Sequence, residues 1–235
     1  MQRFFLEINI LWQKEIILNN NEIIFQLTKV LRSKVWDEVL FFNWKTFFDY
    51  KYKITSIDKK NIIFSFVEKI VKDIEEKKLV LFQSIPNNLG KIEEIINFWT
   101  QVWFIEFNFF KSERSQYLKL GENKIDRFKK IIKESSELSN RNIIPKLNFL
   151  EKLDFSKITW EKVFFHTENE KSIKLKDLSL DLTQNINIFI WPEWGFSQKE
   201  NDEFIKNWCK KVNLWSHILR TQVAPIVVWF FIWQS

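Results

Sequence analysis

The C-terminal two thirds of the chain alternates between two hydrophobic patterns. Short apolar runs such as LVLFQSI and INIFI are typical of buried strands, whereas residues 123–140 place Ile125, Phe128 and Ile132 on one helical face. Strands that alternate with helices predict a parallel sheet with helices on its faces. The predicted strands cover residues 79–85, 104–110, 162–167, 186–190 and 211–214, and the predicted helices cover residues 90–102, 123–140 and 197–208.

The N-terminal part follows a strand pattern interrupted by one helix. Residues 22–32 place Ile23, Leu27 and Leu31 on one helical face, and they stand among four β-rich stretches. A charged segment over residues 68–78 separates this part from the rest. We therefore expect a β-rich unit over residues 1–72 and an α/β unit over residues 73–235. The predicted strands of the first unit cover residues 3–10, 34–43, 49–57 and 61–70.

The connection between residues 187–190 and the helix after it contains an anomaly. Ser197 and Glu200 have the spacing of a capping box, so a helix is expected to begin near Ser197. The turn before it, WPEWGF, contains two tryptophans where glycine is the usual residue, because glycine alone reaches positive φ freely. The tryptophans at 191 and 194 therefore need an explanation.

The composition offers one. The chain has three glycines and twelve tryptophans, which together make up about 6% of its residues, close to the usual glycine share of about 7%. Trp44 stands after Asn43 where Asn-Gly would mark a hairpin, and Trp103 and Trp208 stand where a helix-ending glycine is expected. We hypothesise that the gene reads UGA as glycine and that these positions were translated with the standard code. The alternative is a genuinely tryptophan-rich protein.

Charge and cysteine content narrow the classes of function. The net charge of +6 favours a polyanion such as RNA or an anionic membrane surface, although a coding bias toward lysine would raise it equally. One cysteine excludes an internal disulfide, and with two histidines it makes a Cys/His metal site improbable, so no metal is expected. The N-terminus lacks the apolar core of a signal peptide, and the ten apolar residues from Ala224 to Trp233 are too few to cross a bilayer. A cytoplasmic protein with a buried final helix is expected.

With tryptophan read as glycine, residues 191–197 become GPEGGFS and residues 214–221 become LGSHILRT. This pair resembles the RsmE family of SPOUT-class RNA methyltransferases. The resemblance covers nearly the whole chain, since further motifs follow in the order of the family. They are Val30-Leu31-Arg32, Ser112-Glu-Arg-Ser115, Glu134 with Arg141 and Pro145, and residues 191–200.

The resemblance implies a PUA-like RNA-binding β-barrel followed by a trefoil-knotted α/β domain that forms a homodimer. It also implies methylation of N3 of a specific uridine in 16S ribosomal RNA, with S-adenosylmethionine as the methyl donor and the small ribosomal subunit as partner. Arg220 is the residue expected to orient the substrate or stabilise charge, and a structural ion pair is its alternative role. The cofactor-binding residues implied are Trp191, Pro192, Glu193, Trp194, Gly195, Leu214, Trp215, Ile218, Leu219 and Thr221. The RNA-binding residues implied are Arg3, Arg32, Arg114 and Arg141.

Several positions depart from the family pattern. Gln222 and Val223 replace a glutamate and a threonine, and Leu138 replaces a glutamine. A second hypothesis is therefore a catalytically silent RNA-binding or ribosome-assembly protein on the same scaffold, and a third is a methyltransferase for another RNA or base. His217 is either a catalytic or a structural residue, and the group that accepts the N3 proton is unassigned.

Overall fold

The chain contains two compact units. A computed structural model describes residues 2–6, 13–43, 48–71, 79–115, 120–166, 172–192, 194–213 and 219–234. The first unit comprises Met1–Glu75 together with Ser136–Ile144, and the second comprises Glu76–Ser135 and Pro145–Ser235. The N-terminal unit is thus discontinuous in sequence, a feature that the hydrophobic pattern did not indicate.

The first unit is built on a five-stranded sheet with the order β1-β3-β4-β5-β2. Strand β1 (Gln2–Phe5) pairs in parallel with β3 (Glu38–Phe42), and the remaining pairs are antiparallel. The other strands of this sheet are β4 (Phe48–Ile57), β5 (Ile62–Val71) and β2 (Glu15–Leu18). The predicted helix is present as α1 (Asn21–Phe25), which continues into a π-helical turn, η1 (Gln26–Val30).

Aromatic residues fill the core of this sheet. The Phe41 ring packs edge-on against Phe64 with 5.0 Å between the ring centroids, and it lies 5.6 Å from Tyr52. All three side chains are fully buried, as is Leu27 from η1. Each large aromatic side chain buries much apolar area. These rings therefore make up much of the core between the helix and the sheet.

The second unit is a seven-stranded, all-parallel sheet with the order β10-β12-β9-β11-β6-β7-β8. Every residue of β6 (Leu79–Ser84) and β11 (Ile186–Ile190) is buried, as expected for central strands that are covered on both faces. The other strands are β7 (Phe104–Phe110), β8 (Lys146–Leu150), β9 (Glu161–Phe165), β10 (Ile173–Lys174) and β12 (Lys210–Asn213).

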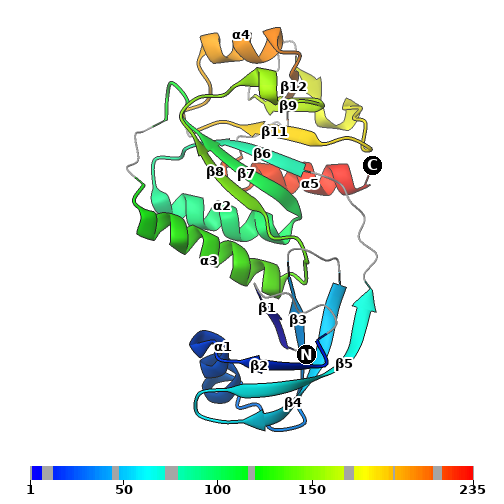
Figure 1. Cartoon of the computed structure of the whole chain (residues 1–235). Helices are drawn as coiled ribbons and strands as arrows, with labels where there is room; N and C mark the ends of the chain where they lie inside the picture. Colours follow the sequence, from blue (N-terminus) through cyan, green and yellow to red (C-terminus); the bar gives the residue numbers. More distant parts are fainter. Residues whose placement is uncertain are drawn as a thin grey trace. The chain divides into compact units, whose positions relative to one another are not determined.

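The predicted helices cover this sheet. Helices α2 (Leu89–Gln101), α3 (Glu122–Leu138) and α5 (Ala224–Gln234) lie on one face, and α4 (Gln198–Lys206) lies on the other (Figure 1). Two short 3-10 turns, η2 (Phe155–Lys157) and η3 (Leu175–Asp177), join strands without helices between them. The prediction of a parallel sheet with helices on both faces is confirmed.

Four tryptophans adopt a left-handed backbone conformation. The φ angles are 81° at Trp36, 65° at Trp103, 72° at Trp160 and 61° at Trp208. Bulky residues rarely reach this region, because the Cβ atom clashes with the backbone. Tryptophan accounts for twelve of 235 residues, yet for four of the six non-glycine residues with positive φ in the described ranges.

Their positions match the sites of helix-ending glycines. Trp103 follows the C-cap Val102 of α2, and Trp208 follows the C-cap Asn207 of α4. The Trp208 indole is 89% exposed, so it contributes little packing that would offset the backbone cost. The backbone therefore supports the hypothesis that these positions are glycine in the natural protein. Trp44 and Trp215 lie outside the described residues.

Candidate active site at the carboxyl ends of the parallel strands

The loops after β6, β7 and β11 leave the same edge of the sheet. These three strands are neighbours and run in parallel, so their carboxyl ends lie together. The strand order also reverses here, since β7 and β8 lie on one side of β6 whereas β9 and β11 lie on the other. Open α/β sheets bind ligands at such a switch point. Two segments follow the strand ends, the loop 111–115 and the turn 191–197.

The turn 191–197 is anchored at its first residue. The carbonyl oxygen of Trp191 accepts hydrogen bonds from Gln83 Nε2 and Thr221 Oγ1, both at 3.2 Å. Within the turn, Gly195 has φ 69° and donates from its N–H to the Pro192 carbonyl at 2.9 Å. The turn therefore combines an anchored first residue with a left-handed position.

The helix after the turn begins with the predicted capping box. Ser197 Oγ accepts from the Glu200 N–H, and the Glu200 carboxylate accepts from the Ser197 N–H at 2.8 Å. The second Glu200 oxygen accepts from the Glu113 N–H at 3.0 Å. One carboxylate thus closes the first turn of α4 and holds the neighbouring loop, which confirms the expected capping role and adds a second one.

The loop 111–115 is tied to this turn by further contacts. Arg114 Nη1 donates to the Trp194 carbonyl oxygen at 2.8 Å. Ser112 Oγ lies 2.6 Å from Ser84 Oγ at the end of β6. Hydrogen bonds from Ser197, and then the nearby Lys199 ammonium, hold the pKa of the exposed Glu113 carboxyl below its ordinary value. Residues Ser112 to Ser115 are therefore a structural part of the site.

The structure brings together most of the predicted cofactor residues that it describes. Trp191, Pro192 and Thr221 are buried, Leu219 is half-buried, and the Trp194 indole is 72% exposed. The hydrogen bond from Thr221 to the Trp191 carbonyl joins the turn to the chain that enters α5. The other predicted cofactor residues lie outside the described part of the chain: Glu193, Leu214, Trp215 and Ile218.

The turn suits a methyl donor held by peptide groups. With glycine at 191 and 194, the anchored turn would let a ligand approach its backbone closely, because no side chain would cover it. The residues present therefore fit S-adenosylmethionine when the two tryptophans are read as glycine. The segment expected to complete the knot, residues 214–218, lies outside the described residues.

Arg220 stands at the start of α5 with its side chain available. The residue is exposed, and its guanidinium makes no hydrogen bond or ion pair with the residues that the structure describes. Its carbonyl oxygen accepts from Val223 and Ala224 as the helix begins. The alternative role as a structural ion pair therefore finds no partner among the described side chains.

Gln222 packs away from this site. Its carbonyl oxygen accepts from Trp99 Nε1 at 3.2 Å, and its side-chain amide donates to Glu94 at 3.3 Å. A glutamate at position 222 would place two carboxylates together. The amide therefore suits its local partner on α2, and this departure from the family pattern has a structural reason.

Two predicted RNA-binding arginines are buried in the N-terminal unit. Arg3 donates from Nε and Nη2 to the Asp49 carboxylate at 3.0–3.1 Å, and from Nη1 to the Ser136 carbonyl at 3.0 Å. Its guanidinium also lies 3.5 Å from the centroid of the Phe42 ring. A side chain with these partners is a structural cation, so the structure does not support the predicted contact of Arg3 with RNA.

Arg141 is fully buried as well. Desolvation lowers the pKa of its guanidinium to about 9. In this conformation no part of the side chain reaches solvent, so its predicted contact with RNA is not supported either. Arg32 and Arg114 are exposed, and Arg32 makes no polar side-chain contact within the described ranges. They remain the candidates for phosphate contacts.

Three contributors to the site were not predicted from sequence: Gln83, Ser84 and Glu113. Gln83 and Ser84 end an otherwise apolar strand, and both are fully buried. A buried polar group needs a partner, so polar residues at the end of an apolar run were an available signal. Glu113 lies within the Ser112–Ser115 motif, from which the sequence predicts a role for Arg114 alone.

Metal and membrane signals are absent from the described residues. No group of three or more histidine, cysteine or acidic residues within them is placed to hold a metal ion. His166 Nε2 lies 3.1 Å from Asn201 Nδ2, in a polar contact between the residue after β9 and α4. Within the same ranges, every helix is too short or too polar to span a bilayer.

Comparison with known proteins adds a family and several relatives. The RNA methyltransferase domain family matches residues 73–233. A protein of Buchnera aphidicola named ribosomal RNA small subunit methyltransferase E is 29% identical over 216 residues, covering 86% of this chain and 81% of its own. The Aquifex aeolicus protein of the same name is 26% identical over 181 residues, covering 76% and 78%.

Solved structures share the fold over the whole chain. A ribosomal RNA small subunit methyltransferase E from Neisseria gonorrhoeae, bound to S-adenosylmethionine, superimposes with a TM-score of 0.87 at 20% identity and covers 100% of this chain and 97% of its own. A protein from Legionella pneumophila, solved in complex with S-adenosylmethionine, superimposes with a TM-score of 0.86 at 20% identity and covers 99% of this chain and 96% of its own.

Proposed function

Because the chain belongs to the RNA methyltransferase domain family, we propose that it transfers the methyl group of S-adenosylmethionine to N3 of a uridine in 16S ribosomal RNA. The names of the curated relatives support ribosomal RNA as the substrate. The observation that carries the proposal is the anchored turn 191–197, joined to Arg114 and Thr221 at the switch point of the sheet. All of these residues lie within the matched range.

The chain's own residues would position the two reactants. S-adenosylmethionine supplies an electrophilic methyl group on a sulfonium. The residues that would hold it are those of the turn 191–195, with Leu219 and Thr221 beside it. Fixing donor and acceptor in one geometry supplies much of the rate of such a transfer, and it needs no covalent intermediate with the protein.

Arg220 would act on the RNA. Its exposed guanidinium has a planar fork that matches a phosphate or a uracil carbonyl oxygen, and it is not engaged by another described side chain. Uracil N3 carries a weakly acidic proton, which a water molecule or a nearby side chain accepts. Arg32 and Arg114 would add phosphate contacts, which make binding weaken steeply with salt.

We further propose a cytoplasmic homodimer formed through the C-terminal region, with the small ribosomal subunit as partner. Helix α5 carries no charged residue, and its Phe230 side chain is 60% exposed. An exposed aromatic residue on an apolar helix favours a protein contact. Sedimentation velocity across a range of protein concentrations tests this, since a monomer at micromolar concentration would contradict it.

The methyl-transfer proposal is tested on small ribosomal subunits from cells that lack the gene. Protein with glycine at all twelve tryptophan positions is incubated with the subunits and radiolabelled S-adenosylmethionine, and the modified nucleoside is identified by mass spectrometry. We expect N3-methyluridine in 16S RNA, and its loss with Arg220→Ala but not with Lys206→Ala, an exposed control on α4. Methylation of another base or RNA would favour the third hypothesis.

The catalytically silent alternative has its own measurement. Calorimetric titration of S-adenosylmethionine into the glycine-bearing protein distinguishes the two, because a silent RNA-binding protein has no need of the donor. Absence of binding together with retained binding to ribosomal RNA would support the alternative. The contact of Gln222 with Glu94 weakens the case for it, since the departure at 222 has a structural explanation.

A further inference from the structure

A cleft lies beside the loop 111–115, on the α4 face of the sheet. Its cavity volume is about 190 Å³, and its mouth is open to solvent. That volume is below the roughly 300–1,000 Å³ of drug-sized ligand sites, so the cleft suits one planar ring of a ligand whose other groups reach the rim. The residues that line it include Phe110, Lys111, Lys152, Phe155, Lys199 and Glu203. No tryptophan lines the cleft, so the cleft does not depend on whether the tryptophan positions are glycine in the natural protein.

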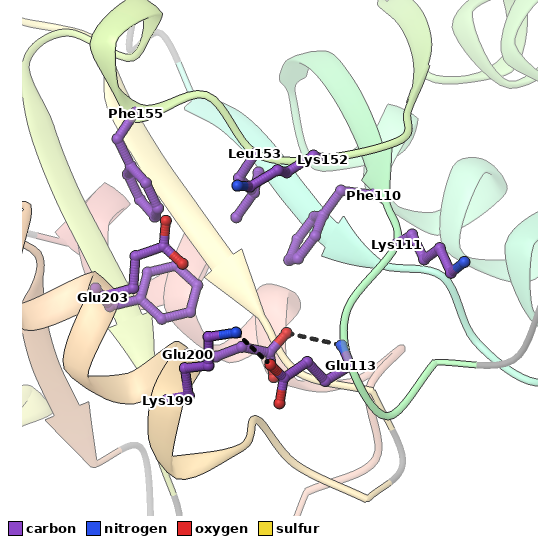
Figure 2. A pocket seen from close by; sticks show the side chains of 10 residues that line it. Phe110, Lys111, Glu113, Lys152, Leu153, Phe155, Lys199, Glu200 and Glu203 are labelled. Carbon is purple, nitrogen blue, oxygen red and sulfur yellow. Dashed lines mark hydrogen bonds and ion pairs between the residues drawn. The ribbon is translucent and has the colours of Figure 1, made fainter.

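Aromatic rings form its walls. Figure 2 shows the rings of Phe155 and Phe110 pointing into the cleft from different sides, with Leu153 and Lys152 between them. Phe155 is half-buried and is held edge-on against Phe204 at 5.5 Å between centroids. A supported, partly exposed ring suits the stacking of a planar heterocycle.

Two of the acidic residues at the cleft are already engaged. The Glu200 carboxylate accepts from the N–H groups of Ser197 and Glu113, and the Glu113 carboxylate lies 3.5 Å from the Lys199 ammonium. They close the local turn, as the dashed contacts in Figure 2 show, and they leave little capacity for a ligand.

The side chains of Glu203 and Lys152 remain available. Neither makes a hydrogen bond or ion pair with any residue that the structure describes. In Figure 2 the Glu203 carboxylate lies beside the Phe155 ring. Lys152 is exposed, and in Figure 2 its side chain lies between the Phe155 and Phe110 rings. The cleft thus combines an aromatic wall, an unpaired anion and an unpaired cation.

These groups select one class of ligand. An ionised carboxylate only accepts hydrogen bonds, so it suits a base edge with adjacent N–H donors. Guanine offers two such donors, N1–H and the N2 amino group. Uracil flanks its single N3–H with two carbonyl oxygens that a carboxylate repels, and adenine and cytosine each place one amino group beside a ring acceptor. The Lys152 ammonium group would attract a phosphate through its charge.

We propose that this cleft binds a guanosine nucleotide, with the base stacked on Phe155, its Watson–Crick edge on Glu203 and its phosphate on Lys152. The nucleotide is either an unpaired guanosine of an RNA strand or a free mononucleotide. The RNA source rests on the proposed function, whereas recognition of the nucleotide does not.

The test is calorimetric titration with GMP, AMP, UMP and CMP, followed by two short single-stranded RNAs that differ by one central G-to-A change. We expect GMP to bind about tenfold more tightly than the other mononucleotides, by analogy with base-edge readout. Glu203→Gln should abolish this preference, while Asp202→Asn, its neighbour on α4, should not. Phe155→Leu should weaken GMP about tenfold and Phe155→Tyr should preserve it.

Each outcome decides a separate point. Tighter binding of the G-containing RNA than of GMP assigns the site to RNA, and binding of GMP alone assigns it to a mononucleotide. Equal affinities for GMP and AMP, a preference that survives Glu203→Gln, or no binding at millimolar GMP would overturn the proposal. Methyl transfer is not measured here, so a failure of the proposed function leaves these results interpretable.

Discussion

Arg114 and Trp194 are joined by a 2.8 Å hydrogen bond across a separation of 80 residues, from the guanidinium Nη1 to the carbonyl oxygen. This bond connects the loop after β7 with the turn after β11, although the Arg114 side chain itself is exposed. An exposed charge-assisted bond contributes about 1 kcal/mol. Its role is therefore to position the turn more than to stabilise the fold.

Replacing this arginine should affect methyl transfer more than folding. With Arg114→Ala we expect kcat/KM to fall about fivefold or more, corresponding to about 1 kcal/mol, with an unfolding midpoint close to that of the parent. Arg127→Ala is the matched control, since Arg127 pairs with Glu93 away from the site. Equal losses of activity in the two variants would show that the Arg114 contact has no special role.

Replacing the left-handed tryptophans with glycine should stabilise the protein. At Trp36, Trp103, Trp160 and Trp208, we expect Trp→Gly to raise the free energy of unfolding by about 1 kcal/mol more than Trp→Ala at the same position. The comparison with alanine isolates backbone strain from loss of the indole. Urea unfolding measures it, and UGG codons at these four positions would contradict the glycine hypothesis directly.

Breaking the buried pair between Arg3 and Asp49 should be costly. Both side chains are almost fully buried, at 5% and 1% exposure, so Arg3→Ala leaves a carboxylate without its cation. We expect a loss of about 3–5 kcal/mol in the free energy of unfolding. The double variant Arg3→Met, Asp49→Leu should lose less than either single change.

The same variants separate a structural role of Arg3 from contact with RNA. A stable Arg3→Ala protein with weakened RNA binding would restore Arg3 as an RNA ligand. A destabilised protein whose double variant binds RNA normally would establish the structural role.

Removing the N-cap of α4 should weaken the helix that supports the site. Ser197→Ala removes the acceptor of the Glu200 N–H, and we expect a loss of about 1 kcal/mol. Ser197→Asp retains an acceptor and should lose much less. Thermal unfolding of both proteins provides the measurement, and an equal loss in the two would mean that a side-chain acceptor at position 197 is not what stabilises the helix.

Acid should loosen the loop 111–115 before it unfolds the protein. The folded pKa of Glu113 lies below its ordinary value of 4.5 because of hydrogen bonding from Ser197 and the charge of Lys199. A depressed pKa stabilises the fold above the ordinary value, and that stability is lost as pH falls through the folded pKa. NMR titration of the Glu113 carboxyl should give a midpoint below 4.5, and Lys199→Ala should raise it.

The central strands and most helices were predictable because a buried strand is an apolar run in the sequence and a packed helix has apolar residues on one face. Strands β6 and β11 are covered on both faces, so they are apolar runs. Strand β8 was not predicted, because it is the edge of its sheet and its residues are only partly buried. Strand β2 has four residues, too few for alternation to be distinctive.

The candidate site was predictable only where one segment carries the whole signal. The capping box and the turn with tryptophan at expected glycine positions both lie within residues 191–200. Both predictions therefore depend on one continuous segment of sequence. The burial of Arg3 depends on Asp49 and Asn142, which are 46 and 139 positions away. Nothing local distinguishes such an arginine from one that faces RNA.

The discontinuous N-terminal unit has a consequence for biosynthesis. Arg3 donates hydrogen bonds to the Ser136 carbonyl and to Asn142 Oδ1, so the first strand and a segment translated much later share one buried network. A nascent chain cannot finish this unit until residue 144 has emerged from the exit tunnel. The unit made first is therefore completed only after more than half of the polypeptide has been synthesised, and an isolated fragment ending at residue 75 should fail to fold.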